Sequence, residues 1–219
     1  MLKFKELINR LRHNRGFGVQ SPSAFYFVTQ VLKEKRPYYA YDSIDTVARI
    51  CGTHSRSYCR RLFRVANFLH PETIIVTGSS RGAALCSLAA ACPSASLHTA
   101  DKEPRLAQEA KEMLHHTQCT THTGDEAELT KELMQKSGDS KLIYIGDSEQ
   151  YAQIAETAIA HATRHTVIIV EQPHKNREKR EWWEQTVLNR ATIVTYDLYS
   201  AGILFFDDEK QKQHYTLLM

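Results

Sequence analysis

The pattern of apolar and polar residues changes near residue 70. Before that point the apolar residues recur at helical spacing, as in the segment Leu2–Asn14. A second helix is predicted to begin at Ser21, an N-cap residue followed by a proline at the first helical position, and to run to about Arg36. We therefore predict a helical N-terminal extension over residues 1–70 and a second domain over residues 71–219.

From Thr73 onward, short β-rich runs alternate with helical patterns, which indicates a parallel sheet with helices on both faces. Only the six residues "DLYSAG" separate the last two runs, so these two strands should pair as an antiparallel hairpin. We predict a doubly wound, Rossmann-like α/β fold with a seven-stranded, mostly parallel sheet that ends in this hairpin. The predicted strands are Ile74–Thr77, Leu97–Ala100, Thr120–Thr123, Lys141–Ile145, Thr166–Val170, Thr192–Tyr196 and Ile203–Phe206. Helices are predicted after Pro104, through Leu106, Ala110, Met113 and Leu114, and over Tyr151–Ala162.

Composition fits an ordinary globular protein, with 42% hydrophobic and 24% charged residues in 219. No apolar run approaches the roughly 20 residues that a membrane span needs, so no membrane association is expected. The first residues lack the uninterrupted apolar stretch of a secretory signal. The five cysteines are odd in number and form no CxxC pair, which favours reduced thiols in a cytoplasmic protein.

Positive charge is concentrated in the first third of the chain. Residues 1–71 hold 13 Lys and Arg against 4 Asp and Glu, although the whole chain carries only +3. Arg56, Arg60 and Arg64 recur every four residues and should line one face of a helix. This basic region is a candidate nucleic-acid surface. The alternative interpretation is a solvated helix face, and it is the simpler one.

Glycine or polar residues follow each of the first five predicted strands. Parallel strands place their carboxyl ends at one edge of the sheet, where ligands of such folds bind. Glycines let the backbone approach a ligand closely, and a carboxylate after the second strand can accept both hydroxyl groups of a ribose. In chain order these residues are Gly78, Ser79, Ser80 and Gly82; Asp101; Gly124 and Asp125; Gly146 and Asp147; and Glu171, Gln172 and His174.

The string "VTGSSRG" on its own resembles the glycine loop of short-chain dehydrogenases, which bind a nicotinamide dinucleotide. Those enzymes use a tyrosine four residues before a lysine, and none of the ten tyrosines here has a lysine at that position. The loop also follows about 70 residues of helical pattern, whereas those enzymes usually begin with it. This interpretation is therefore the weaker one.

Three longer stretches resemble class I S-adenosylmethionine-dependent methyltransferases, in particular the small O-methyltransferase-like branch. They are "RLFRVANFLHPETIIVTGSSRG", "SLHTADKEP" and the closing "ATIVTYDLYSAGILFFDDEKQKQHY", and the resemblance spans about residues 55–219. It implies S-adenosylmethionine as the cofactor and often a homodimer. By the same resemblance Gly78, Ser79, Ser80 and Gly82 would cradle the methionine moiety, Asp101 would hold the ribose, and Gly124 and Asp125 would lie by the adenine.

The sequence departs from that branch at positions that carry chemistry. Val76 stands where an acidic residue usually helps to hold the cofactor's amino group, and Gly146 stands where the fourth strand usually ends in aspartate. The fifth strand ends in Glu171-Gln172 instead of the usual Asp-Asp or Asp-Asn. A catalytically inactive binding or assembly protein is therefore an alternative to an active enzyme.

The predicted activity is methyl transfer to a small-molecule acceptor, at oxygen. The step requires a positioned nucleophile and a group that removes its proton. The candidate catalytic residues are Asp147, Glu171 and His174. Asp147 and Glu171 could also hold Mg²⁺, and His161 and His165 are spaced to reach one zinc ion, but Gly146 replaces the usual metal ligand and no third zinc ligand is evident, so no metal site is predicted. An RNA methyltransferase that docks through the basic N-terminal third is a further alternative.

Overall fold

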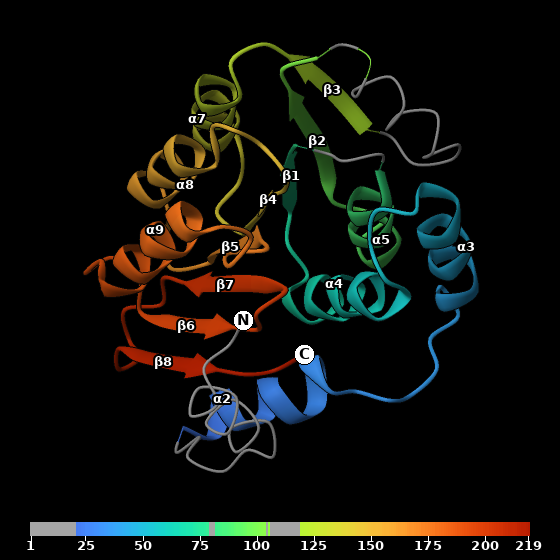
Figure 1. The fold of residues 1–219 in the computed structure, drawn as a ribbon, viewed down its shortest axis with the longest axis horizontal. Coiled ribbons are helices and arrows are strands. Elements are labelled where there is room, and N and C mark those ends of the chain that lie inside the picture. The colour runs from blue at the N-terminus through green and yellow to red at the C-terminus, as the bar shows by residue number, and fades with distance from the viewer. Residues whose placement is uncertain (1–20, 79–81, 104, 106–118) are drawn as a thin grey trace.

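The computed structural model describes residues 21–78, 82–103, 105 and 119–219. Its centre is one mixed sheet with strand order β3-β2-β1-β4-β5-β7-β6-β8 (Figure 1). The first five strands run parallel, and β7 is antiparallel to both β5 and β6. The predicted doubly wound α/β fold and its antiparallel hairpin are thus confirmed. The strands are β1 (Thr73–Thr77), β2 (Ser96–Asp101), β3 (Cys119–Thr123), β4 (Lys141–Ile145), β5 (Thr166–Glu171), β6 (Val194–Asp197), β7 (Ala201–Phe205) and β8 (Gln213–Thr216).

The central strands are buried along their whole length, as expected for parallel strands covered on both faces. Every residue of β1, β4 and β5 is buried, and their sequences "TIIVT", "KLIYI" and "TVIIVE" are rich in β-branched residues. Such side chains pack well on a pleated surface. Local composition therefore explains why these three predictions of strand position hold to within one residue.

The eighth strand was not predicted, so the expected count of seven is corrected to eight among the described residues. β8 pairs parallel with β6 at the edge of the sheet. Of its four residues only Tyr215 is buried. Short, half-exposed edge strands lack the alternation that marks an inner strand.

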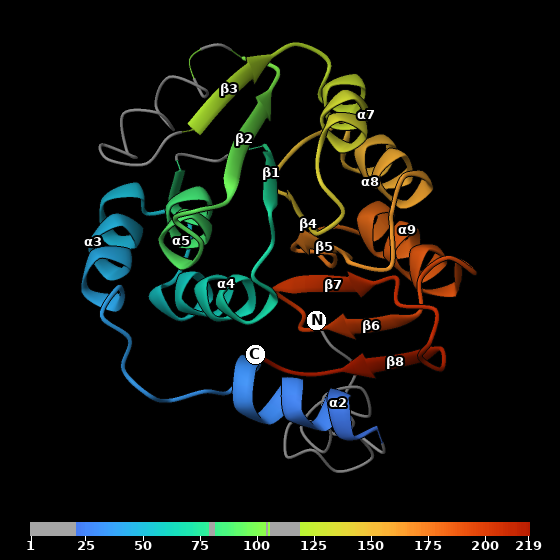
Figure 2. The ribbon, with the colours of Figure 1, turned by 180° about the vertical axis from the view of Figure 1, so that it is seen from behind.

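Helices cover the two faces of the sheet in separate layers (Figures 1 and 2). One layer contains α4 and α5 with α3 outside them, and the other contains α7, α8 and α9. Each layer encloses its own cluster of buried apolar residues. The helices are α3 (Tyr41–Cys51), α4 (Arg56–Leu69), α5 (Ala83–Ala91), α7 (Glu126–Lys136), α8 (Tyr151–Ala160) and α9 (Arg177–Leu188).

The described part of the N-terminal extension packs directly on the sheet. Helix α2 (Pro22–Tyr26) continues into a π-helical segment, η1 (Phe27–Leu32), and the side chain of Ser21 caps α2 as predicted. Phe27 lies against Tyr196 of β6, with 4.9 Å between the ring centroids. The helices before residue 70 and the sheet therefore share one apolar cluster. The predicted helices over Leu2–Asn14 and after Pro104 lie outside the described residues.

The arginine-rich face of α4 is solvated at Arg56 but buried at Arg64, which corrects that interpretation in part. Arg64 is only 9% exposed, and it donates to the carbonyl oxygens of Val31 and Leu32 at 2.8 Å each and to the Tyr41 hydroxyl at 3.1 Å. Arg60 forms a two-pronged ion pair with Asp45. Two of the arginines in the N-terminal third, Arg60 and Arg64, therefore hold α3 and η1 against α4. Among the described helices none is long and apolar enough to cross a membrane.

Candidate functional site

The turn after β1 has the geometry that its glycines predict. Gly78 has φ +57° and Gly82 has φ +83°, a backbone region that favours glycine. A Cβ atom on Gly78 would lie 3.1 Å from the backbone of Asp147, so the ends of β1 and β4 approach each other closely. Ser79 and Ser80, which were predicted to complete this cradle, lie outside the described residues.

The ends of β2 and β3 lie beside that turn and carry the next predicted residues. Asp101, the last residue of β2, is fully buried, and its carbonyl oxygen accepts from the Gly124 amide at 3.2 Å. Asp125 caps α7 by accepting from the Glu128 amide at 2.9 Å, and this hydrogen bond lowers the pKa of its carboxyl group. The structure therefore brings Asp101, Gly124 and Asp125 to adjacent strand ends.

A buried carboxylate that the sequence analysis missed also reaches this turn. Glu126, the first residue of α7, accepts from the Gly78 amide at 3.2 Å and from the Ser148 hydroxyl. Burial is the main reason why the pKa of Glu126 is raised above 4.5. Val76, where the resemblance leads one to expect an acid, belongs to the apolar cluster on the other face of the sheet. A carboxylate is thus present at the glycine turn, but it comes from α7 and not from β1.

The presence of glycine at position 146 has a steric explanation. A Cβ atom at this position would lie 2.2 Å from the Gly78 carbonyl oxygen and 3.0 Å from that of Thr77. The Gly146 amide donates to the Thr77 carbonyl oxygen at 2.9 Å, so the two strand ends are tied together. The aspartate that the resemblance leads one to expect at this point does not fit the backbone of this chain.

Glu171, the last residue of β5, lies in a buried cluster of polar side chains. The Tyr144 hydroxyl donates to its carboxylate at 2.8 Å, and His54 Nε2 lies 2.9 Å from the other carboxylate oxygen. The Tyr58 hydroxyl lies 3.2 Å from that of Tyr144, and the His54 ring stacks on the Tyr58 ring. Burial raises the pKa of both tyrosines well above 10. His54 was not predicted, because it precedes α4 and approaches β5 only through packing.

The other two candidate catalytic residues have separate partners. Asp147 is 57% exposed at its side chain and pairs with Lys175 at 2.6 Å. His174 Nε2 lies 2.7 Å from the Asp197 carboxylate, and its ring stacks on Tyr199. The structure therefore places Asp147, Glu171 and His174 near the same edge of the sheet but in three different sets of contacts.

The histidines that were considered as zinc ligands also have separate contacts. His161 Nδ1 lies 2.9 Å from the Thr157 carbonyl oxygen, whereas His165 lies 3.7 Å from the Asp139 carboxylate. Within the described part of the chain, no cluster of three or more His, Cys, Asp or Glu residues has the geometry to hold a metal ion.

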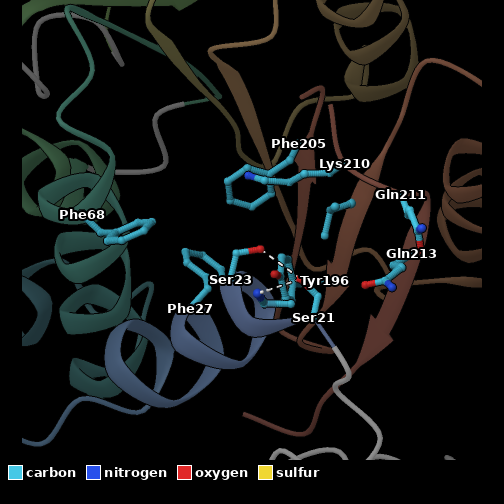
Figure 3. A pocket seen from close by; sticks show the side chains of 11 residues that line it. Ser21, Ser23, Phe27, Phe68, Tyr196, Phe205, Lys210, Gln211 and Gln213 are labelled. Atoms are coloured by element: carbon cyan, nitrogen blue, oxygen red, sulfur yellow. Dashed lines mark hydrogen bonds between the residues drawn. The ribbon is translucent and has the colours of Figure 1, made fainter. Parts of the chain in front are cut away.

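Two cavities lie on the face of the sheet that α4 covers. One, of about 280 Å³, lies beside Glu171 and is lined by His54, Tyr58, Arg61 and Ser200 among others. The other, of about 320 Å³, has aromatic walls formed by Phe27, Phe68, Tyr196 and Phe205 (Figure 3). Because Phe205 pairs with the first half of β5, this second cavity lies toward the opposite edge of the sheet from the strand ends.

Comparison with known proteins supports the fold through structure and not through sequence. No protein-family model matches the chain, and no curated protein sequence matches it. A methyltransferase from Geobacter sulfurreducens superposes with a TM-score of 0.62 at 16% identity, over 83% of this chain and 96% of that one. An O-methyltransferase from Bacillus cereus in complex with S-adenosylhomocysteine (SAH) gives a TM-score of 0.60 at 13% identity, over 80% of this chain and 94% of that one. An SAH-bound methyltransferase from Podospora anserina gives 0.61 at 12% identity, over 86% and 97%. The chain therefore has the fold of the small O-methyltransferases.

Proposed function

We propose that this protein is an S-adenosylmethionine-dependent methyltransferase that acts on a small molecule at oxygen. The observation that carries the proposal is the fully buried carboxylate of Asp101 at the end of β2, next to the positive-φ glycine turn after β1. In a doubly wound sheet this is the place where a ribose and its attached groups are held. Two solved structures of similar fold contain SAH, which adds support.

The residues at the strand ends fit such a cofactor in their chemistry. Asp101 would accept from the ribose hydroxyl groups, Gly78 and Gly82 would let the chain approach closely, and Asp125 would lie at the adenine end. The cofactor would supply an electrophilic methyl group. The protein's part is to orient the acceptor and to take its proton.

The groups best placed to take that proton are Glu171 and His54. They lie 2.9 Å apart beside a cavity, and each has an exposed side-chain fraction below 10%. A histidine next to a carboxylate is a common general base near neutral pH. Asp147 is less suitable because its carboxylate is already paired with Lys175 at the surface.

Calorimetric titration with SAH tests the cofactor part of the proposal. We expect saturable binding by the wild type and by Asp208→Asn, an exposed control outside the site. Asp101→Asn should weaken binding by about tenfold or more, because a hydrogen bond to a charged group contributes about 1.5–3 kcal/mol. Absence of binding by a well-folded wild type, or equal binding by both variants, would refute the proposal.

A second candidate function is a binding protein that keeps the fold without the reaction. It is favoured by the close contact of Gly146 with the Gly78 carbonyl oxygen, which leaves no room for an acid at the end of β4. The two candidates differ in turnover. Transfer of a labelled methyl group to any acceptor from a panel of hydroxylated molecules would exclude the inactive form, whereas tight SAH binding with no transfer would favour it.

A further inference from the structure

Arg61 is a buried cation with a hydrogen-bond donor that the described residues do not use. The residue lies in the second turn of α4 and is 9% exposed. Its Nη1 donates to the Ser200 hydroxyl at 3.2 Å. Its Nε is buried and has no hydrogen-bond partner among the described residues. A buried donor without a partner is costly, so this group requires an explanation.

The acidic side chains near Arg61 already have other partners. Asp45 holds Arg60 through both carboxylate oxygens, at 2.8 and 2.6 Å. Glu171 accepts from Tyr144 and lies 2.9 Å from His54. Among the described residues, no Asp or Glu forms an ion pair with Arg61. Arg61 therefore carries a positive charge that no carboxylate side chain of the described residues pairs with directly.

The neighbouring Arg64 adds a second positive charge beside Arg61. Arg64, one turn further along α4, is held by two carbonyl oxygens and a hydroxyl, all of them neutral groups. Burial and the charge of Arg64 lower the pKa of Arg61 to about 10. The guanidinium thus stays protonated at neutral pH, and an anion beside it would relieve the electrostatic cost.

Arg61 also lines the cavity beside the end of β5. This cavity has a volume of about 280 Å³, and its other walls include His54, Tyr58, Glu171, Gln172 and Ser200. The volume is near the lower end of the range for small-ligand sites, about 300 Å³. The Ser200 hydroxyl accepts from Nη1 and donates to the Met219 carbonyl oxygen at 3.1 Å, so it holds the guanidinium in place. The Nε–H remains available to a group inside the cavity.

We propose that this cavity binds a small molecule through an anionic group, a carboxylate or a phosphate, that is held by the Arg61 guanidinium, which Ser200 positions. The free Nε–H of a guanidinium shares one edge with a terminal nitrogen, and that edge matches two oxygens of a carboxylate or phosphate. The proposal does not rest on the cofactor site, because it concerns residues of α4 and of the turn before β7. If the methyltransferase proposal also holds, an acidic acceptor would lie within reach of Glu171 and His54.

Burial favours a small ligand over a nucleic acid. A polymer backbone would contact exposed cations such as Arg56, whose side chain is 73% exposed, before it reached Arg61. The adjoining groove of about 950 Å³ is lined by Lys33, Lys35 and Arg56 among others. RNA binding would therefore affect the groove residues at least as strongly as Arg61.

Nuclear magnetic resonance of the arginine Nε–Hε groups in the wild-type chain tests the proposal directly. The Arg61 signal is assigned as the one absent in Arg61→Lys, and the Arg56 signal serves as the control from the same helix. Sodium acetate and inorganic phosphate are titrated separately against sodium chloride at constant ionic strength. We expect a saturable shift of the Arg61 signal and only a linear drift of the Arg56 signal. Saturation by acetate identifies a carboxylate site, and saturation by phosphate alone identifies a phosphate site.

A thermal unfolding series gives a second measurement that does not depend on the assignment. The anion that saturates the Arg61 signal should raise the melting temperature of the wild type and of Arg56→Gln, but not that of Arg61→Gln. The proposal is overturned if neither anion saturates the Arg61 signal, if Arg61→Gln is stabilised as much as the wild type, or if only an RNA oligonucleotide shifts the signals of both arginines. Because neither measurement includes SAH, their failure is distinguishable from failure of the methyltransferase proposal.

Discussion

Replacing Gly146 with alanine tests whether the ends of β1 and β4 are locked together by backbone contact. The new Cβ atom would lie 2.2 Å from the Gly78 carbonyl oxygen, whereas ordinary contacts begin at 3.4 Å. About 1 Å of movement is therefore needed, and it must come from the backbone of two neighbouring strands. Overpacking of this kind costs about 1–3 kcal/mol. For a chain of this size each kcal/mol lowers the melting temperature by about 2–4 °C, which gives a decrease of about 2–12 °C.

Gly138→Ala is the matched control. Its Cβ atom would lie 2.3 Å from the Glu72 carboxylate, almost the same nominal overlap, but the contacted atom is the end of an exposed side chain that can turn away. We expect the free energy of unfolding of this variant to stay within about 0.5 kcal/mol of the wild type, or to rise slightly because alanine restricts the unfolded chain. Urea unfolding of both variants provides the comparison.

Equal free energies of unfolding for the two variants would refute the reasoning, because the argument depends on what the new methyl group meets and not on the loss of a glycine. The same contact predicts that Gly146→Asp will be destabilised at least as much as the alanine variant. Introducing the aspartate that the resemblance leads one to expect at this position should therefore not create a metal site in this chain.

Three further substitutions test the buried polar groups. Glu126→Gln should become more stable relative to the wild type as the pH rises above 4.5, because a carboxyl group whose folded pKa is raised destabilises the fold as it ionises; urea midpoints across pH measure this, with the exposed Glu128→Gln as control. Arg64→Gln should lower the free energy of unfolding by about 3 kcal/mol, since three buried acceptors lose their donor, whereas Arg56→Gln should change it by less than about 0.5 kcal/mol in the same urea assay. Tyr144→Phe should cost about 1–3 kcal/mol, because it removes a hydrogen bond to a buried carboxylate, and an unchanged urea midpoint would contradict the assigned cluster.

The parts of the fold that could be predicted are those that local composition determines. Strands such as β5 form continuous β-branched runs, and the short "DLYSAG" connection leaves an antiparallel hairpin as the natural arrangement. The convergence of Asp101, Gly124 and Asp125 also follows, since parallel strands end at one edge. Edge strand β8 has no such signal, because it is short and mostly polar.

The parts that could not be predicted depend on which side chains meet across distant segments. His54 approaches Glu171 only because the start of α4 packs over the end of β5. Arg64 has the same local pattern as a solvated helix residue, and only the docking of η1 and α3 makes it a buried donor. Glu126 directly follows the predicted Asp125, but the direction of its side chain is set by the axis of α7. Periodicity records which face of an element is apolar, and it does not record partners.

The position of the two tryptophans has a practical consequence for spectroscopy. Both lie in α9, and Trp183 is 1% exposed, with its ring so close to Gly202 of β7 that a Cβ atom there would lie 2.3 Å from it. Arg61 lies in α4, on the opposite face of the sheet. Intrinsic fluorescence should therefore report separation of α9 from the sheet during unfolding, and it should stay nearly constant while an anion enters the cavity beside Arg61.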